Sequence, residues 1–466
     1  MVFNSLFFFL TLVPLLGLYY GIRVAHPRAG KVLLLVYSYI FYGMWNPAFL
    51  SLLVGSTVLD YWVARGLEAW PSRKRLLLVT SLVIEFGLLG FFKYYNFFVG
   101  ATASVFRLAG FAFDPPLLRI LLPIGISFYT FHCVSYTVDV YRGRIRAERS
   151  FLDVALFVAF FPQLVAGPIL RAGHFLPQLQ HPPSITRQDV TDGLVLVLVG
   201  LFLKVVIADN IAGRVAFLFD QWRAIGLPAT WAAAMLFGVQ IYMDFNGYSL
   251  IAIGLGQMLG YHIPMNFDAP YGAAGFSDFW RRWHISLSTW LRDYLYIPLG
   301  GNRRGAVRTY VNLAVTMLLG GLWHGASVMF VIWGAMHGAY LCVERFIREK
   351  FAPAVHLPPA VATAALIVIT YVTVTITWIP FRATTAEQCL GMLRQMFTGS
   401  MGYDSTLVRD YVVVAVVFAA HCASRRYDVV ATIQRHAGLR FVCATVILLA
   451  LYFYSGERSE FIYFQF

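Results

Sequence analysis

Long apolar runs recur along this chain and constrain its fold more than any other feature. No domain-sized polar block interrupts them, and only 13% of the residues are charged. Soluble domains carry about a quarter charged residues, so most of this surface must face something other than water. A helix crosses a bilayer with about 20 apolar residues. The sequence therefore predicts an all-α polytopic membrane protein that forms a single integral membrane domain over residues 1–466.

The candidate spans are 3–22, 31–45, 47–65, 76–99, 117–141, 189–208, 229–260, 308–323, 327–347, 360–381, 410–423 and 440–455. Segment 151–170 is apolar too, but Pro162 and Gly167-Pro168 interrupt it, and proline breaks a helix. Broken backbone at membrane depth is tolerated where it is buried or lines a cavity. We therefore expect 151–170 to be re-entrant. Aromatic residues and arginines alternate closely in 276–296, which predicts an amphipathic helix in the cytoplasmic interface.

The excess of positive charge has a simple membrane explanation. The chain has 36 Lys+Arg against 23 Asp+Glu, a net charge of +13. The cations gather in short loops between apolar runs, which is typical of cytoplasmic loops beside anionic lipid and not of nucleic-acid binding. If an even number of helices crosses the membrane between each neighbouring pair of these clusters, all the clusters lie on the cytoplasmic side. Both termini then lie on the outer side. The five cysteines have no metal-binding spacing, so no metal site is predicted.

The polar residues concentrate in one stretch, from Asp278 to Gly325. It contains two Trp-His pairs, Trp283-His284 and Trp323-His324, and a group of arginines. Ionisable groups at membrane depth are costly, so such a concentration indicates a functional site. His324 lies between glycines in Gly-Gly-Leu-Trp-His-Gly, at the start of an apolar run. A neutral imidazole there suits a general base that removes a hydroxyl proton.

Each histidine also has a purely structural explanation. His324 could instead be hydrogen-bonded between packed helices. His284 is either a second catalytic or donor-binding group, or an interfacial histidine on an amphipathic helix. His337 lies about three and a half turns beyond His324 if one helix continues through both, and we expect it to support packing.

The arginines of this stretch are candidates for binding phosphate groups. Guanidinium groups pair bidentately with phosphate, so Arg281, Arg282 and Arg292 could hold a nucleotide-bearing acyl thioester, beside Trp283 and Trp323. For the neighbouring Arg303, Arg304 and Arg308, an ordinary basic cytoplasmic loop is the alternative explanation.

Two further polar features lie outside this stretch. Asp244-Phe-Asn-Gly-Tyr-Ser249 places an acid, an amide and hydroxyls inside an apolar run, for interhelical hydrogen bonds or for function. The chain ends in Phe-Ile-Tyr-Phe-Gln-Phe466. This tail is either an aromatic anchor in the membrane interface or a segment that folds back and presents the Tyr463 hydroxyl to a cavity.

The motif that begins Asp278-Phe-Trp-Arg-Arg-Trp-His-Ile-Ser and ends Pro298-Leu-Gly-Gly-Asn-Arg-Arg-Gly305 resembles the signature of the membrane-bound O-acyltransferase (MBOAT) family. The branch that it resembles contains bacterial alginate O-acetyltransferases and the D-alanyl transferase of teichoic acids. The Phe161–Arg171 segment and the Trp323-His-Gly block match in the same order. At position 250 this chain has leucine where family members often have an acid, and at 328 it has valine in place of tryptophan.

The resemblance implies an MBOAT fold of roughly 11–13 transmembrane or re-entrant helices around a central funnel. It also implies an O-acetyltransferase of the bacterial inner membrane, with acetyl-CoA as the cytosolic donor, no bound cofactor, and an exported polysaccharide as acceptor. His324 matches the essential histidine of the family and His284 its second signature histidine. A periplasmic acetyltransferase is the implied partner. The tail resembles a motif that carries acyl groups in teichoic-acid systems, which makes Tyr463 a candidate relay.

Two alternative functions remain open at this point. Broken helices and buried polar groups also suit a polytopic transporter or polysaccharide-export component, although no internal repeat is visible. An acyltransferase acting on lipid is the third hypothesis.

Overall fold

A computed structural model describes residues 3, 5–111, 113, 115–164, 167–351, 358–402, 405–455 and 461–462. These residues are helical with irregular connections, and no strand occurs among them. The chain divides into two compact units. Unit 1 is Met1–Val197 with Ile251–Pro264, and unit 2 is Leu198–Leu250 with Met265–Phe466. The predicted all-α class is confirmed, whereas the single domain over 1–466 stays a prediction.

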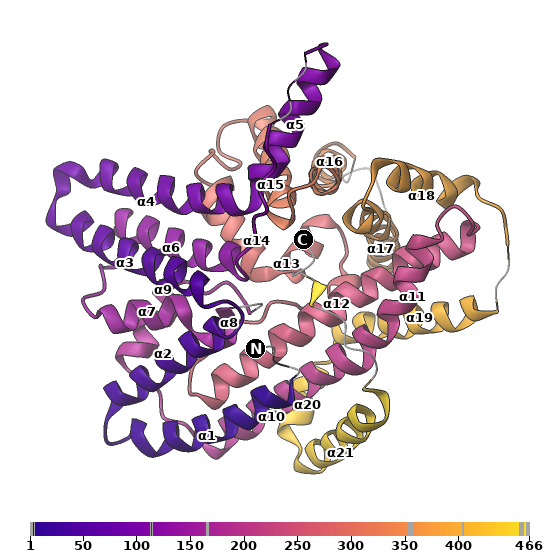
Figure 1. The fold of residues 1–466 in the computed structure, drawn as a ribbon. Helices are drawn as coiled ribbons and strands as arrows, with labels where there is room; N and C mark the ends of the chain where they lie inside the picture. Colours follow the sequence, from indigo (N-terminus) through magenta and orange to yellow (C-terminus); the bar gives the residue numbers. More distant parts are fainter. Residues whose placement is uncertain are drawn as a thin grey trace. The chain divides into compact units, whose positions relative to one another are not determined.

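Unit 1 is built mainly from the N-terminal helices (Figure 1). These are α1 (Leu6–Arg23), α2 (Pro27–Gly43), α3 (Pro47–Ala69), η1 (Pro71–Arg73), α4 (Lys74–Leu89), the π-helical turn η2 (Gly90–Tyr94), α5 (Tyr95–Leu108), α6 (Ile126–Tyr141), α7 (Phe151–Ala159), α8 (Phe161–Leu164), α9 (Ala172–Gln180) and most of α10 (Arg187–Leu201).

Unit 2 contains the Trp-His pairs. Its elements are the π-helical turn η3 (Phe202–Ala208), α11 (Asp209–Asp220), most of α12 (Leu227–Met258), η4 (Pro270–Gly272), α13 (Phe276–Arg282), α14 (Ile285–Leu291), the π-helical turn η5 (Arg292–Tyr296), α15 (Ala306–His324), α16 (Val328–Lys350), α17 (Pro359–Arg382), α18 (Ala386–Thr398), α19 (Thr406–Ser424), α20 (Val429–Arg435) and α21 (Ala437–Tyr454).

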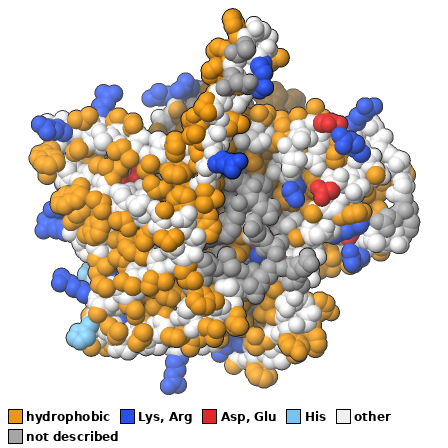
Figure 2. All heavy atoms as spheres, in the orientation of Figure 1, with side chains coloured by type: hydrophobic (Ala, Val, Ile, Leu, Met, Phe, Trp, Pro, Cys, Tyr) orange, Lys and Arg blue, Asp and Glu red, His pale blue; other side chains and the backbone are white. Residues whose placement is uncertain are grey.

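Several helical stretches of the described chain are long and apolar enough to cross a membrane. They are Leu6–Arg23, Pro47–Ala69, Pro71–Leu108, Arg187–Asp220, Pro359–Arg382, Thr406–Ser424 and Ala437–Tyr454. Hydrophobic side chains cover much of the face in Figure 2, and lysine and arginine side chains lie mostly along its margins. Exposed apolar area of this extent needs an apolar partner. The protein is therefore a multi-pass membrane protein.

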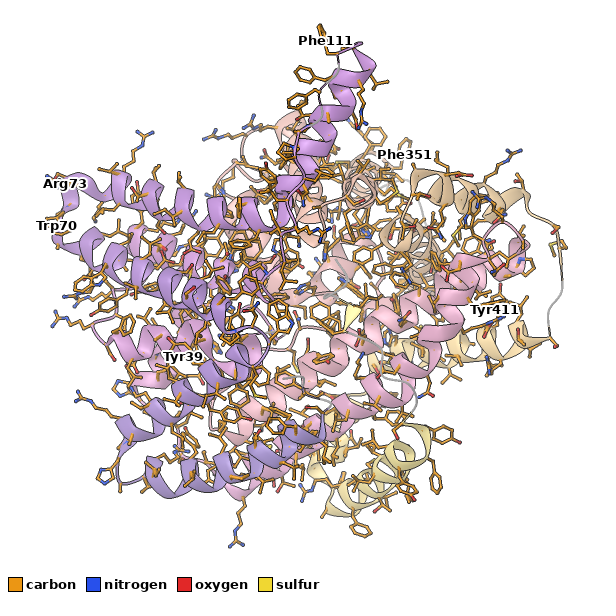
Figure 3. All side chains as sticks on the ribbon, viewed as in Figure 1. Tyr39, Trp70, Arg73, Phe111, Phe351 and Tyr411 are labelled. Atoms are coloured by element: carbon orange, nitrogen blue, oxygen red, sulfur yellow. The ribbon has the colours of Figure 1, made fainter. Side chains whose placement is uncertain are left out.

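The turns between the first helices follow the predicted positions. Asn46 caps α3, since its side chain accepts a hydrogen bond of 3.0 Å from the Ala48 amide, and Pro47 occupies the first helical position. Trp70 and Arg73 lie at the next turn, between α3 and α4, in Figure 3. Asn46 and Pro47 thus form a tight turn at the boundary between the candidate spans 31–45 and 47–65.

The expected span over 117–141 is only partly helical. Helix α6 begins at Ile126, and residues 115–125 are irregular apart from a turn at its start. Pro123 disfavours a helix, and Gly125 adopts a positive φ of 75° that few other residues accept. The prediction of a continuous helix was wrong in its first part because these two residues define a turn and not a span.

The break expected in 151–170 is confirmed. Helix α7 ends at Ala159, and α8 is a single turn that contains Pro162. The buried backbone at this break has hydrogen-bond partners. The Ser38 hydroxyl accepts from the Phe161 amide at 3.1 Å, and the Gln163 side-chain amide donates to the Phe157 carbonyl at 2.7 Å. Such satisfaction is the condition for irregular backbone in a membrane protein.

Candidate functional site

The segment predicted as one amphipathic helix over 276–296 is broken at Trp283-His284. Helix α13 ends at Arg282 and α14 begins at Ile285. His284 has a φ of 42°, in the left-handed region that few non-glycine residues adopt. Asn266 explains the break, because its carbonyl accepts from the Ile285 amide at 2.9 Å and its side chain accepts from the Ser286 amide at 3.2 Å. The single-helix prediction was therefore wrong.

The same asparagine orients the His284 ring. Its Oδ1 atom lies 3.1 Å from His284 Nδ1 and 2.9 Å from the Ser286 hydroxyl. A backbone amide can only donate, so the atom that the Ser286 amide reaches must be the oxygen of Asn266. His284 therefore donates from Nδ1, and in the neutral ring Nε2 carries the lone pair. Complete burial lowers the pKa of His284 to about 3, so the ring is neutral near pH 7.

Trp283 lies inside an aromatic cluster. Its indole is 1% exposed and stacks on Phe279, with ring centroids 5.6 Å apart. Phe267 and Trp378 each contact it at 5.1 Å. Aromatic pairs at such distances add stability beyond the area that they bury. In this structure Trp283 fixes the backbone that presents His284.

His324 is the last residue of α15, so it ends one helix and does not begin the next apolar run as expected from the sequence. Residues 325–327 separate the two helices, and Ser327 caps α16 by accepting from the Met329 amide at 3.2 Å. The His324 ring is 3% exposed. Three rings surround it with centroids 5.0–5.4 Å away, namely Trp333, Trp323 and Phe381.

Glycines bring the backbones of α15 and α16 into contact beside His324. A Cβ atom on Gly321 would lie 2.3 Å from the Phe330 carbonyl oxygen, and one on Gly334 would lie 2.4 Å from that of Met317. Real Cβ atoms do not approach so closely, so only glycine fits at either position. This packing sets the end of α15, and with it the position of His324.

The two Trp-His pairs meet in unit 2. The Trp323 ring lies 6.0 Å from that of His284 and 5.1 Å from that of His324. His337 is not on the same helix as His324, so the expectation of one continuous helix was wrong. Its ring contacts Trp333 at 4.6 Å, and its Nε2 lies 3.1 Å from the Thr377 hydroxyl. His337 thus packs behind the site, the supporting position expected of it.

The three arginines differ in how they are engaged. Arg282 bridges two carboxylates, with Nε 3.1 Å from Asp278 and a terminal nitrogen 2.9 Å from Asp268. Its role in this structure is to hold α13 to the preceding loop. The Arg281 side chain is 72% exposed, and that of Arg292 is 59% exposed while pairing with Asp293 at 2.8 Å. The charged side chains of Arg281 and Arg292 are therefore mostly exposed, whereas that of Arg282 is not.

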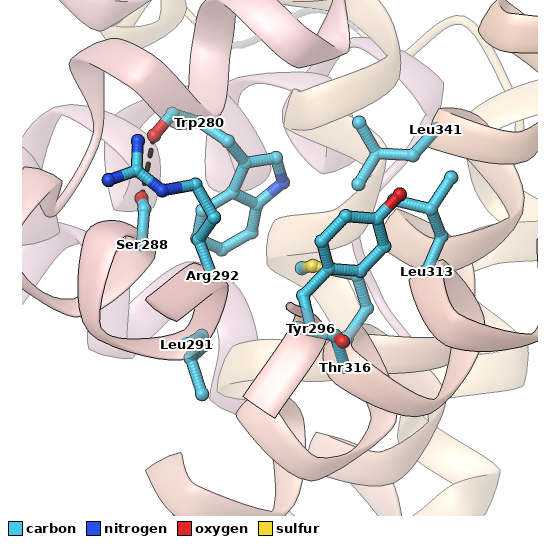
Figure 4. Close-up of a pocket in the computed structure, with 9 residues that line it drawn as sticks. Trp280, Ser288, Leu291, Arg292, Tyr296, Leu313, Thr316 and Leu341 are labelled. Carbon is cyan, nitrogen blue, oxygen red and sulfur yellow. Dashed lines mark hydrogen bonds between the residues drawn. The ribbon is translucent and has the colours of Figure 1, made fainter. Parts of the chain in front are cut away.

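A cavity of about 220 Å³ lies beside Arg292 (Figure 4). Its lining residues are Trp280, Ser288, Leu291, Arg292, Tyr296, Leu313, Thr316, Met317 and Leu341. The wall is mostly apolar, as in most small-molecule sites. The Ser288 hydroxyl in this wall donates to the Trp280 carbonyl at 2.6 Å. The Trp280 ring contacts Trp333 at 5.8 Å, and Trp333 in turn contacts His324.

Asp244 on α12 belongs to a buried cluster of charged side chains. Lys204 Nζ lies 2.8 Å from Asp244 and 2.7 Å from Asp209, and all three side chains are at most 3% exposed. Buried charges persist in proteins when they are paired and hydrogen-bonded. The other Asp244 oxygen accepts from the Ile462 amide at 2.7 Å. The C-terminal segment is therefore held against α12 at Ile462.

The folded-back tail predicted from the sequence is supported as far as Ile462. Phe461 is 1% exposed, and its ring contacts Tyr248 at 4.4 Å and Phe245 at 6.0 Å. Phe245 also contacts the His284 ring, at 4.6 Å. Tyr463 itself lies outside the described residues, so its candidate role as a relay stays a prediction.

The model of the membrane-bound O-acyltransferase family matches residues 117–384. The chain belongs to this family. The match covers more than half of the sequence and includes both Trp-His pairs. The protein is accordingly a membrane-bound O-acyltransferase, an enzyme that transfers an acyl group to oxygen. The C-terminal tail lies beyond the matched residues.

Comparison with individual relatives shows which members of the MBOAT family the chain resembles. The chain is 44% identical over 406 residues to "Probable alginate O-acetylase AlgI" of Pseudomonas aeruginosa, an alignment that covers 85% of this chain and 75% of the relative. It is 37% identical over 430 residues to the "Peptidoglycan O-acetyltransferase" of Helicobacter pylori, covering 85% and 80%. With "Teichoic acid D-alanyltransferase" of Bacillus subtilis it shares 27% over 246 residues, covering 48% and 60%. Nothing in these matches favours the transporter hypothesis.

Reasoning from the sequence missed the partners that position this MBOAT site. Asn266 lies outside the quoted motifs, yet it holds His284. The sequence did contain a signal for the pairing of Lys204 with acidic residues such as Asp209, because a lysine in the apolar run 189–208 needs a buried carboxylate. Asp244, which the sequence did single out, supplies one.

Proposed function

We propose that this enzyme moves an acetyl group from a cytosolic thioester, acetyl-CoA, to an exported polysaccharide of the alginate type. The observation that carries the proposal is the 44% identity to an alginate O-acetylase over 85% of the chain. The name of a second relative, "Peptidoglycan O-acetyltransferase", also describes the transfer of acetyl groups to a glycan, which supports the same reaction class.

In this proposal His324 is the general base and His284 its supporting partner. A general base must accept a proton during the reaction, and neutral imidazole is the usual group for this. The ring contacts through Trp323 support a common site for both histidines. The neutral state of His284, with its Nδ1 proton directed to Asn266, leaves Nε2 able to accept a hydrogen bond.

The donor would bind through the exposed arginines. Arg281 and Arg292 present guanidinium groups suited to phosphate, while Arg282 keeps α13 in place. The cavity beside Arg292 fits the thioester arm, since its apolar wall leads through Trp280 and Trp333 toward His324. Trp283 and Trp323 would shape the site by packing. The enzyme then needs no bound cofactor, only its acyl donor.

Tyr463 is the proposed relay. Its phenol oxygen attacks the thioester carbonyl while His324 takes the phenol proton. The C–S bond breaks, the thiolate leaves and recovers that proton from His324, and an acetyl ester remains on tyrosine. An acceptor hydroxyl then attacks the ester carbonyl, the bond from the carbonyl carbon to the tyrosine oxygen breaks, and the acceptor's proton returns to the phenolate. The hydrogen bond from Ile462 to Asp244 supports this proposal, because it fixes the residue next to Tyr463.

The proposed location is the bacterial inner membrane, with both termini on the periplasmic side. The relay tyrosine would then face the side on which a polysaccharide is exported. A periplasmic acetyltransferase of the kind that acts in alginate acetylation is the proposed partner that receives the acetyl group. The basic loops would face the cytoplasm and the anionic leaflet.

The relay can be tested by comparing Tyr463→Phe with Tyr427→Phe, a control at an exposed tyrosine far along the chain from the tail. Each variant replaces the native enzyme in cells, and the O-acetyl content of the exported polysaccharide is measured. Tyr463→Phe should abolish acetylation at an unchanged protein level, and Tyr427→Phe should not. Mass spectrometry of the C-terminal peptide should find the acetyl group on Tyr463 after incubation with acetyl-CoA.

A further variant, Asp244→Asn, tests how the tail is held. It keeps the size of the side chain but leaves Lys204 with one carboxylate fewer, so acetylation should fall while Tyr463 remains present. Full acetylation in Tyr463→Phe would exclude a covalent relay through that hydroxyl without touching the acetyltransferase assignment. Absence of any acetyl transfer by the native enzyme would contradict the assignment itself.

A further inference from the structure

Three neighbouring helices of unit 1 turn polar residues toward one another. Helices α3, α4 and α6 pack side by side (Figure 1). Each contributes two polar side chains four residues apart, a spacing that places both on one face of a helix. The pairs are Ser56 with Asp60, Ser81 with Glu85, and Cys133 with Thr137.

The three acidic or thiol groups of this set come close together. Asp60, Glu85 and Cys133 are each 0% exposed. One ligand atom from each, a carboxylate oxygen or the sulfur, lies within 4.8 Å of the other two. Two of these residues belong to helical stretches that are candidates for crossing the membrane. Nothing in the proposed acyl transfer uses them.

Hydrogen bonds leave most of these atoms unsatisfied. The Ser81 hydroxyl donates to Asp60 Oδ1 at 2.6 Å. Among the described residues, no hydrogen bond reaches Asp60 Oδ2 or either carboxylate oxygen of Glu85. The Ser56 hydroxyl, 2% exposed, faces the Glu85 carboxylate without the geometry of a hydrogen bond. These atoms converge on one buried point.

Such a cluster is costly unless something compensates it. Carboxylates in a protein interior are found paired with cations or bound to metals, since an isolated buried charge costs many kcal/mol. Protonating Glu85 would remove only its own charge, and the Asp60 carboxylate would stay buried in the same cluster. A cation at the point of convergence would satisfy both carboxylates and the thiol together.

We propose that Asp60, Glu85 and Cys133 bind one divalent metal ion of the zinc class. Zinc takes thiolate and carboxylate ligands at about 2.0–2.3 Å in tetrahedral geometry, and the sulfur ligand disfavours magnesium and calcium. The Ser56 hydroxyl or a water molecule would complete the four ligands. The two carboxylates and the thiolate together carry a charge of −3, which the ion reduces to −1. The metal joins α3, α4 and α6, so its role is to hold unit 1 together.

The metal content of the purified protein tests this inference. Cells are grown with added zinc, the protein is purified in detergent and dialysed against metal-free buffer, and bound metals are measured by mass spectrometry. The native protein should retain about one zinc ion per chain. Glu85→Gln and Cys133→Ser should retain about a tenth of that or less. Cys389→Ser, at a buried cysteine of unit 2, is the matched control and should retain the full amount.

Cobalt substitution gives a second measurement, and its result for the native protein does not depend on any variant. Cobalt(II) bound to a thiolate gives a charge-transfer absorption band, so the native protein loaded with cobalt should show one. The band should persist in Cys389→Ser and disappear in Cys133→Ser. Zinc should also raise the unfolding temperature of the native protein. A native protein that holds no zinc and gives no cobalt band would overturn the proposal, as would equal metal content in all variants.

Discussion

The two Trp-His pairs share a sequence pattern but are held in different ways. His284 occupies a break between two short helices, in a left-handed conformation, and a hydrogen bond to Asn266 fixes its ring and its proton. His324 ends a long helix and is surrounded by three aromatic rings. The first histidine is oriented by a polar bond that favours one tautomer. The second packs against aromatic rings, and it is the ring whose protonation changes in the proposed reaction.

The largest expected effect comes from His324→Ala. Loss of a general base lowers the rate of such reactions by about 10²–10⁴-fold. Acetyl transfer from labelled acetyl-CoA by the purified enzyme should fall within that range, with little change in protein yield. His436→Ala, at an exposed loop histidine, is the control and should keep full activity. If His324→Ala keeps more than a tenth of native activity, another residue is the general base.

A smaller effect, with a pH signature, is expected from His284→Gln. Activity should fall about 10–100-fold, as when a partner of a reactive group is removed. Burial holds the pKa of His284 at about 3, below its value of about 6.5 in an unfolded chain. As pH falls from 6.5 toward 3, the unfolded state therefore binds the proton first, and folding is weakened.

Thermal unfolding in detergent at pH 7 and pH 5 measures this signature. The native protein should lose more stability on acidification than His284→Gln, which has no ring to protonate. Asn266→Ala leaves the ring in place but removes its acceptor and serves as the comparison. An equal loss of stability in native enzyme and His284→Gln would mean that another group dominates the acid response.

The smallest effect is expected at the exposed arginines. Arg281→Ala and Arg292→Ala should each raise the KM for acetyl-CoA by about fivefold, since exposed charge pairs contribute up to about 1 kcal/mol. The turnover number should hardly change, and added salt should reduce the difference. Arg303→Ala tests the alternative of an ordinary basic loop and should leave the KM unchanged. Equal increases in KM in all three variants would indicate that the positive charge of the whole region attracts the donor, and not a specific donor site.

The sequence predicts the class of the fold and the position of the site well, because both depend on local patterns. Apolar runs indicate helices, and Pro162 marks the break between α7 and α8. The Trp-His pairs stand out because polar groups are rare in such a chain. These signals need no knowledge of which helices are neighbours.

Contacts between distant segments could not be predicted in the same way. Asn266 holds His284, Lys204 pairs with Asp244, and Ile462 is bound by that same aspartate. Each pair depends on how the helices pack, and a single sequence carries little information about packing. The broken helix at His284 shows the limit most clearly, because its residues alone are typical of a continuous amphipathic helix.

The end of α15 at His324 has an electrostatic consequence. Peptide dipoles add along a helix, so the carbonyl groups of its last turn carry a partial negative charge of about half an electron. This helix has 19 residues, and His324 is the last of them. A proton that arrives on that ring meets the favourable end of the dipole, which stabilises a cation by up to about 2 kcal/mol in a partly buried site. The backbone of α15 would thus favour the imidazolium that a general base becomes.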